Sequence, residues 1–216
     1  MSTSPDGMAT HDCMDAGGRA TQEAKAEVIF QRPVRHLPGD LAMWFFILAE
    51  LTVFALLIVT FAVAQALQPA LFHASRAALD SSIGLALTLS LLTAGLFAAL
   101  AQEQLRRARS RRGAWLLLAA LLAASVYVWL KLAEYGHLAA QGLGMEHNNF
   151  FTLYWILTGF HFLHVLLGML ILAWLALRCW RRSQVADDAA LESGVLYWHM
   201  VDLIWVLLFP LVYVLN

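Results

Sequence analysis

The stretch FFTLYWILTGFHFLHVLLGMLILAWLAL, which runs from Phe150 to Leu177, decides the fold class. It contains no acidic or basic residue except His161 and His164. An apolar run longer than about 18 residues predicts a transmembrane helix. Two histidines three positions apart are neighbours on a helix surface, and a polar side chain in a bilayer has to contact protein or water. We therefore expect both histidines to point into a bundle, where other helices supply their partners.

The composition of the whole chain is that of an integral membrane protein. Of its 216 residues, 61% are hydrophobic and 13% are charged, and the mean hydropathy is +0.66. A soluble domain is closer to half apolar and a quarter charged. The net charge of −1 argues against a nucleic acid as partner. The two cysteines indicate no disulfide framework.

The chain is expected to divide into a disordered cytoplasmic tail over residues 1–36 and a transmembrane domain over residues 37–216. The first 30 residues are polar and rich in small side chains, and they lack the apolar core of a signal peptide. His11, Asp12 and Cys13 are candidate metal ligands within this tail. Three neighbouring ligands in a flexible segment rarely hold an ion, so we predict no metal there.

Five apolar segments predict an all-α bundle of five transmembrane helices. Lysine and arginine concentrate before the first segment and in the loops after the second and fourth, whereas the loops on the opposite side contain only Arg76. Because basic loops stay in the cytoplasm, the N-terminus is predicted inside and the C-terminus outside. The helices are expected at about Leu41–Ala66, Ser82–Ala101, Ala114–Tyr135, Phe150–Leu177 and Leu196–Leu215, with a kink at Pro210 because proline lacks a backbone donor.

Two helix faces are candidates for close packing or for contact with a partner. Small residues recur every four positions in the second segment and allow another helix to approach closely. That helix can belong to the same subunit or to a partner, and the same subunit is slightly favoured. The first segment offers a second face, directed away from Glu50, as the expected partner surface. The small residues are Ser82, Ala86, Ser90, Ala94 and Ala98, and the partner surface comprises Phe45, Thr52, Val59 and Val63.

Depth in the membrane indicates which polar side chains can meet. At about 1.5 Å of rise per residue, Glu50 lies about 15 Å from the cytoplasmic end of its helix and His164 about 20 Å from the cytoplasmic end of its own. Both are therefore near the midplane, where a contact between Glu50 and a histidine is feasible. His161 lies about one turn further out.

Two other polar pairs have the spacing that places them on one helix face. His199 and Asp202 lie about 5–10 Å inside the cytoplasmic boundary, and Lys131 and Glu134 lie near the outer boundary. The Lys131–Glu134 pair can partly neutralise itself, and the lysine can extend toward the membrane surface.

A metal or haem site built from His161, His164, His199 and Asp202 was weighed against a structural role. The two pairs differ in depth by about 10 Å, whereas metal–nitrogen bonds are about 2 Å long. Hydrogen bonds between helices are therefore the favoured interpretation, with lipid head-group contact and a subunit interface as open alternatives.

Three motifs carry a resemblance to a known family, and the resemblance covers residues 37–216. The helix GFHFLHVLLG from Gly159 to Gly168 and the segment YWHMVDLIW from Tyr197 to Trp205 are similar to helices of the haem-copper (cytochrome c) oxidase subunit III family. Glu50, in FILAE, resembles the membrane-embedded glutamate of that family, and Glu134-Tyr135 matches the end of a preceding helix. The five-helix form lacks the first two helices of seven-helix members.

The details are most similar to the five-helix branch associated with nitric oxide reductase, because YWHM and Phe209-Pro210 differ from the WHFxD pattern usual in ubiquinol oxidases. The resemblance implies a multi-pass subunit of the bacterial inner membrane that supports respiratory electron transport, in aerobic respiration or denitrification. Such a subunit has no catalytic residue, haem or metal of its own. It packs on a catalytic haem-containing subunit and binds phospholipid, and Glu50 and the histidines are packing or lipid positions.

Two other function classes were considered. An independent proton or solute carrier would use Glu50, Lys131 and Glu134 as relay groups, but it needs a continuous polar path, and the membrane interior offers few polar residues. A stand-alone redox enzyme would need a bound cofactor, which an absorbance spectrum of the purified protein would reveal.

Overall fold

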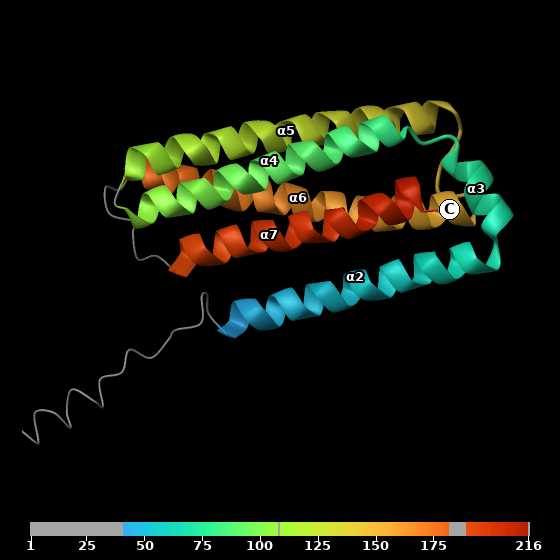
Figure 1. Ribbon diagram of the computed structural model, residues 1–216, viewed down its shortest axis with the longest axis horizontal. Coiled ribbons are helices and arrows are strands. Elements are labelled where there is room, and N and C mark those ends of the chain that lie inside the picture. The colour runs from blue at the N-terminus through green and yellow to red at the C-terminus, as the bar shows by residue number, and fades with distance from the viewer. Residues whose placement is uncertain (1–40, 108, 182–188, 216) are drawn as a thin grey trace, which may run out of the picture. The chain divides into compact units, whose positions relative to one another are not determined.

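The computed structural model describes residues 41–107, 109–181 and 189–215, with side chains from Met43 onward, and all its regular elements are helices. The predicted tail, with His11, Asp12 and Cys13, lies outside the described residues. Five helices, α2 and α4 to α7, are long and apolar enough to cross a membrane, which confirms the predicted fold class. In chain order (Figure 1) the elements are α2 Leu41–Leu67, α3 Pro69–Arg76, α4 Ser81–Arg106, α5 Ser110–Ala140, α6 Asn149–Arg181, α7 Ala189–Phe209 and a π-helix, η1, Pro210–Val214.

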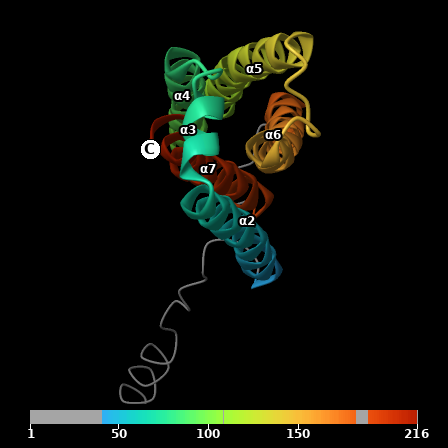
Figure 2. The same ribbon diagram turned by 90° about the vertical axis from the view of Figure 1, so that its right-hand side faces the viewer.

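Helices α4, α5, α6 and α7 form a four-helix bundle in which each helix packs against its two neighbours, while α2 lies outside against α6 and α7 (Figure 2). Burial follows this arrangement: 61% of the most apolar window of α7 is buried, compared with 17% for α2. Helix α7 is therefore central and α2 peripheral, with most of its surface turned outward.

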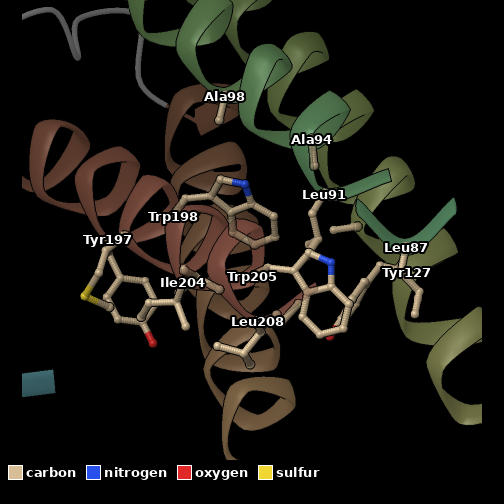
Figure 3. Close-up of a cluster of buried hydrophobic side chains, with 14 of the residues drawn as sticks. Leu87, Leu91, Ala94, Ala98, Tyr127, Tyr197, Trp198, Ile204, Trp205 and Leu208 are labelled. Carbon is tan, nitrogen blue, oxygen red and sulfur yellow. The ribbon is translucent and has the colours of Figure 1, made fainter. Parts of the chain in front are cut away.

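The interface between α4 and α7 is formed by large aromatic rings that pack on small side chains. Trp198 and Trp205 of α7 are almost completely buried, and Figure 3 shows them beside Ala94 and Ala98 of α4. The Trp205 Nε1 donates a hydrogen bond to Thr88 Oγ1 at 3.0 Å. Apolar burial gives little net drive between helices in lipid, so this close packing is what holds α7 in the bundle.

The small-residue stripe of α4 lies inside the subunit only over its second half. Ala94 and Ala98 are fully buried, whereas Ser82 and Ala86 are exposed. Four residues of an α-helix turn through about 400°, so a four-residue repeat drifts around the helix by about 40° per step. At Gly95 a Cβ atom would lie 2.1 Å from Asp202 Oδ2, so the glycine permits α7 to come this close.

The observed helices extend beyond the predicted bounds at their ends, and the short helix α3 is an additional element that was not predicted. Helix α3 begins at Pro69, directly after the predicted end of the first span, because proline is tolerated in the first turn of a new helix. The predicted disturbance at Pro210 is confirmed: α7 ends at Phe209, and the backbone continues as the π-helix η1. The amide of Leu215 donates to Pro210 O at 2.7 Å and closes this segment.

Candidate functional site

Lys131 on α5 is completely buried. Its Nζ donates to Glu134 Oε2 at 2.7 Å, to Tyr154 OH of α6 at 3.0 Å and to Tyr213 OH of η1 at 3.0 Å. Tyr213 OH in turn donates to Glu134, 2.7 Å from Oε1 and 2.9 Å from Oε2. The lysine and the glutamate together are neutral, whether as an ion pair or as two uncharged groups. The network therefore joins α5, α6 and the C-terminal segment without a net charge.

Aromatic rings enclose the same ammonium group. Lys131 Nζ lies 4.9 Å from the ring centroids of Tyr135 and Tyr154, 5.4 Å from Trp205 and 5.7 Å from Tyr213. The electron-rich faces of such rings stabilise a cation that has lost its water. Lys131 therefore does not extend to the membrane surface, although its length allows this, because the side chain finds partners inside the bundle.

Glu50 of α2 and His164 of α6 meet at the junction of the peripheral helix with the bundle. Glu50 Oε2 lies 3.0 Å from His164 Nε2, and His164 Nδ1 lies 2.8 Å from the Phe160 carbonyl oxygen. A carbonyl can only accept, so Nδ1 carries a hydrogen, and the Nε2–Oε2 contact holds one further proton. The pair is then neutral overall, which lowers the cost of placing a carboxyl group in the membrane.

His161 does not share the environment of His164. A separation of three residues turns the helix through about 300°, so the two rings diverge by about 60°. His164 points toward Glu50, whereas His161 is fully buried in the bundle with its ring centroid 5.0 Å from that of Trp205 and 6.3 Å from that of Tyr127. Both ring nitrogens of His161 and the Tyr127 hydroxyl lack a hydrogen-bond partner among the described residues.

His199 and Asp202 both lie beside Gly95 of α4 but differ in burial. A Cβ atom at Gly95 would lie 2.1 Å from Asp202 Oδ2 and 3.7 Å from His199 Nδ1. Asp202 is 6% exposed, whereas His199 is exposed. Among the described residues, the Asp202 Oδ1 and the Trp198 Nε1 have no hydrogen-bond partner. The described residues contain no group of three histidine, cysteine, aspartate or glutamate side chains that could hold a metal ion, so the four candidate ligands do not converge.

A further polar contact, at the opposite end of the bundle from the basic loops, was not predicted. Arg76 at the end of α3 is buried, and its guanidinium donates to the carbonyl oxygens of Val212 at 2.9 Å and Leu211 at 3.1 Å, as well as to that of Leu215. Burial lowers the pKa of Arg76 from its ordinary value, but arginine stays protonated at neutral pH. Arg76 therefore satisfies the carbonyl groups that end the last helix.

These unpredicted residues leave only a weak signal in the amino-acid sequence. Arg76 is the single basic residue in its loop, which was used only to count charges. Tyr154 and Tyr213 are tyrosines inside apolar segments, where a buried hydroxyl usually has a partner. Their partner was identifiable only once α5, α6 and η1 had been placed together.

Comparison with known proteins gives the family. The model of the family described as "Cytochrome c oxidase subunit III" matches residues 34–216, which is most of the chain. The chain belongs to the cytochrome c oxidase subunit III family. The Glu50–His164 and Lys131–Glu134 contacts both lie within the matched residues.

Three relatives illustrate how subunit III occurs in this family. A probable quinol oxidase subunit 3 of Staphylococcus aureus is 27% identical over 179 residues, which cover 82% of this chain and 89% of the relative. A cytochrome bo(3) ubiquinol oxidase subunit 3 of Pseudomonas aeruginosa is 31% identical over 110 residues, 50% of this chain and 52% of the relative. A heme-copper oxidase subunit I+III of Aeropyrum pernix is 31% identical over 137 residues, 62% of this chain but 17% of the relative. The aligned part thus spans about half the length of the Pseudomonas relative and a small part of the Aeropyrum one.

Proposed function

We propose that this chain is a non-catalytic subunit III of a respiratory haem-copper enzyme in the bacterial inner membrane. The observation that carries the proposal is the family match over residues 34–216, together with relatives named as subunit 3 of quinol oxidases. The haem and metal of the complex would belong to a partner subunit. The Aeropyrum relative is named subunit I+III, which favours a subunit I as the partner of this chain.

The polar side chains within the membrane support a structural role. Glu50 is engaged by His164, and Lys131 and Glu134 are engaged by each other and by Tyr213. Hydrogen bonds between described residues do not connect these two groups, whereas a carrier would need a connected path. The carrier alternative has no support from the relatives either, since their printed names describe oxidase subunits.

The orientation can be tested with a reporter fused after Asn216. The basic loops after the second and fourth spans favour a cytoplasmic N-terminus, so a C-terminal alkaline phosphatase should be active and a C-terminal green fluorescent protein dark. Fusions of the same reporters to the loop after α4 should give the opposite pattern. A fluorescent C-terminal fusion would reverse the proposed orientation.

The proposed partner surface lies on α2. The side of α2 that packs on the bundle includes Phe54 and Phe61, which are almost completely buried. The opposite side is apolar and exposed, with Phe45 at 71%, Val59 at 58% and Val63 at 53%, and Thr52 is exposed among them. The Thr52 hydroxyl donates to Leu48 O at 2.8 Å, so it is satisfied within its own helix. It therefore needs no water molecule when a partner helix packs against this side of α2.

Tryptophan at Thr52 or Val59 should weaken binding to the catalytic subunit. A bulky ring would hold the two surfaces apart, and close packing is the main attraction between helices in lipid. We expect the yield of catalytic subunit recovered with a tagged chain to fall about 10-fold or more, which corresponds to about 1.4 kcal/mol. The measurement is pull-down yield divided by the membrane level of each variant.

Leu122→Trp is the matched control, because Leu122 is 71% exposed on α5 and lies outside the proposed surface. It should insert normally and retain the partner. If Thr52→Trp and Val59→Trp also retain the partner at normal membrane levels, the α2 placement is wrong, and the exposed half of the α4 stripe becomes the next surface to test.

A narrower proposal is that the partner belongs to the nitric oxide reductase branch. It rests on the final helix, in which Tyr197-Trp198-His199-Met200 is followed by Phe209-Pro210 and the π-helix η1. Two of the named relatives are quinol oxidase subunits and the third is a heme-copper oxidase subunit, which makes an oxidase the competing partner. Purification of the native complex, with partner identification and assays of nitric oxide and oxygen consumption, distinguishes the two.

A further inference from the structure

One side chain from each helix of the four-helix bundle meets the others near the bundle axis. These side chains are Thr88 of α4, Tyr127 of α5, His161 of α6 and Trp205 of α7, and all four are buried. The ring centroid of Trp205 lies 5.2 Å from that of Tyr127 and 5.0 Å from that of His161. Since α5 and α7 are opposite one another in the bundle, the contact between Tyr127 and Trp205, seen in Figure 3, crosses the axis.

This layer of side chains lies deep in the membrane-spanning region. His161 is about 18 Å along the helix axis from the start of α6 at Asn149, and about 30 Å from its end at Arg181. Tyr127 is about 25 Å and about 20 Å from the two ends of α5. Both side chains are 0% exposed. Bulk solvent therefore does not reach them, and any polar partner must be bound inside the fold.

Three polar atoms in this layer have no partner among the described residues. They are Nδ1 and Nε2 of His161 and the hydroxyl oxygen of Tyr127. A neutral imidazole has one N–H donor and one acceptor nitrogen, and a phenol hydroxyl both donates and accepts. An unpaired buried polar group is costly, so such groups are nearly always bonded to protein or to ordered water.

The neighbouring side chains cannot supply these partners. The indole of Trp205 has a single polar hydrogen, which it donates to Thr88, and it has no acceptor. Phe54, whose ring centroid lies 6.2 Å from that of His161, has no polar atom. The ammonium group of Lys131 lies over the same Trp205 ring, but its three hydrogens are all donated elsewhere. The partner must therefore be a small molecule.

We propose that the bundle axis binds ordered water at the His161 imidazole and the Tyr127 hydroxyl. Water both donates and accepts, so it suits either ring nitrogen and the hydroxyl together. An ion would satisfy only donors or only acceptors, and it would bring a charge into the membrane interior, where the Lys131–Glu134 pair is already balanced. A buried water makes about three hydrogen bonds, so very few molecules satisfy the three atoms.

The bound water gives His161 a role that differs from that of His164. His164 pairs with Glu50 at the junction with α2, whereas His161 is held by water at the axis. Water at His161 and Tyr127 supplies a polar connection for α5 and α6 in the layer where the Trp205–Thr88 hydrogen bond connects α7 and α4. This role belongs to the folded chain itself and does not depend on which complex the chain joins.

The sign of a stability change distinguishes a hydrated hydroxyl from a dry one. Tyr127→Phe removes one oxygen atom and keeps the ring contacts. With water bound, we expect the equilibrium constant for unfolding to rise about five-fold, which corresponds to the loss of about 1 kcal/mol of hydrogen bonding. A dry, unpaired hydroxyl would give the opposite sign, because its removal ends a desolvation cost. The measurement is reversible unfolding of the full-length chain in mixed micelles of dodecyl maltoside and dodecyl sulfate.

Tyr135→Phe is the matched control, because the Tyr135 hydroxyl donates to Thr158 Oγ1 at 3.0 Å. This variant loses a hydrogen bond to protein and should be destabilised by a similar factor. It shows that the unfolding assay detects the loss of a single hydroxyl in this bundle.

X-ray radiolytic footprinting of the wild-type chain tests the water directly. A pulse of X-rays converts bound water into hydroxyl radicals, which oxidise the side chains beside them, and mass spectrometry locates the products. Tyr127 and His161 should be oxidised several-fold faster than Phe150, although all three are 0% exposed. Phe150 is the matched control, since it is an aromatic residue of α6 without a polar atom. This experiment decides the proposal even if Tyr127→Phe fails to fold.

Three results would overturn the proposal. A Tyr127→Phe variant that is as stable as the wild type or more stable, beside a destabilised Tyr135→Phe, would mean that the Tyr127 hydroxyl is dry. Oxidation of Tyr127 and His161 no faster than that of Phe150 would mean that the axis holds no water. Equally fast oxidation of all three would mean that the whole bundle opens to solvent and that no local site exists.

Discussion

Replacing Lys131 with methionine should destabilise the protein more than any other single substitution discussed here. The change removes the three hydrogen bonds that Lys131 donates and leaves Glu134, which is 6% exposed, as a carboxyl group without its cation. Removal of one member of a buried ion pair costs about 3–5 kcal/mol. We expect a large fall in the thermal midpoint in detergent and a reduced level in the membrane.

The double variant Lys131→Met/Glu134→Met shows whether unpaired charge is the cause. A buried pair replaced by apolar side chains of similar volume is often neutral in stability, so the double variant should recover a large part of the loss. Leu132→Met is the matched control, because Leu132 neighbours Lys131 but is 54% exposed. A double variant no more stable than Lys131→Met would show that hydrogen bonds to the tyrosines, and not the charge balance, account for the effect.

Replacing Arg76 with lysine should loosen the C-terminal segment. Lysine keeps the positive charge but lacks the planar fork that reaches the carbonyl groups of Leu211, Val212 and Leu215 together. Hydrogen bonds from charged groups contribute about 1.5–3 kcal/mol each, so losing even one fork contact should be measurable. Hydrogen exchange at residues 211–215 should accelerate about 10-fold or more, with little change in α4 and α5.

His73→Gln is the matched control for Arg76→Lys, since His73 lies on the same short helix and is exposed. It should leave exchange at residues 211–215 unchanged. If Arg76→Lys exchanges at the wild-type rate there, the π-helix is held by contacts other than Arg76, which include those of Tyr213 with Lys131 and Glu134 and the hydrogen bond from Gln65 to Leu215 O. Faster exchange throughout the bundle would instead mean that Arg76 stabilises the whole fold.

The number and the approximate bounds of the membrane spans were predictable from the amino-acid sequence. Segment length and apolar composition are local properties, and a bilayer accepts only segments whose backbone hydrogen bonds are satisfied internally, so the five apolar runs had to be helices. The disturbance at Pro210 was also local, because it follows from a missing backbone donor. Motifs around His161 and Asp202 were sufficient for the family resemblance, since they are contiguous in the chain.

Tertiary structure decided which polar groups meet. Spacing along one helix placed His161 with His164, but a turn of about 300° directs His164 toward Glu50 and His161 toward Trp205. His199 and Asp202 both border Gly95 of α4 and differ only in burial. Depth along the helix axis made a Glu50–histidine contact feasible, and the position of α2 against α6 selected His164. The length of Lys131 allows it to reach the membrane surface, yet Tyr154 and Tyr213 hold it inside. These partners lie 23 and 82 residues away along the chain, and helical periodicity carries no information about which distant segments pack together.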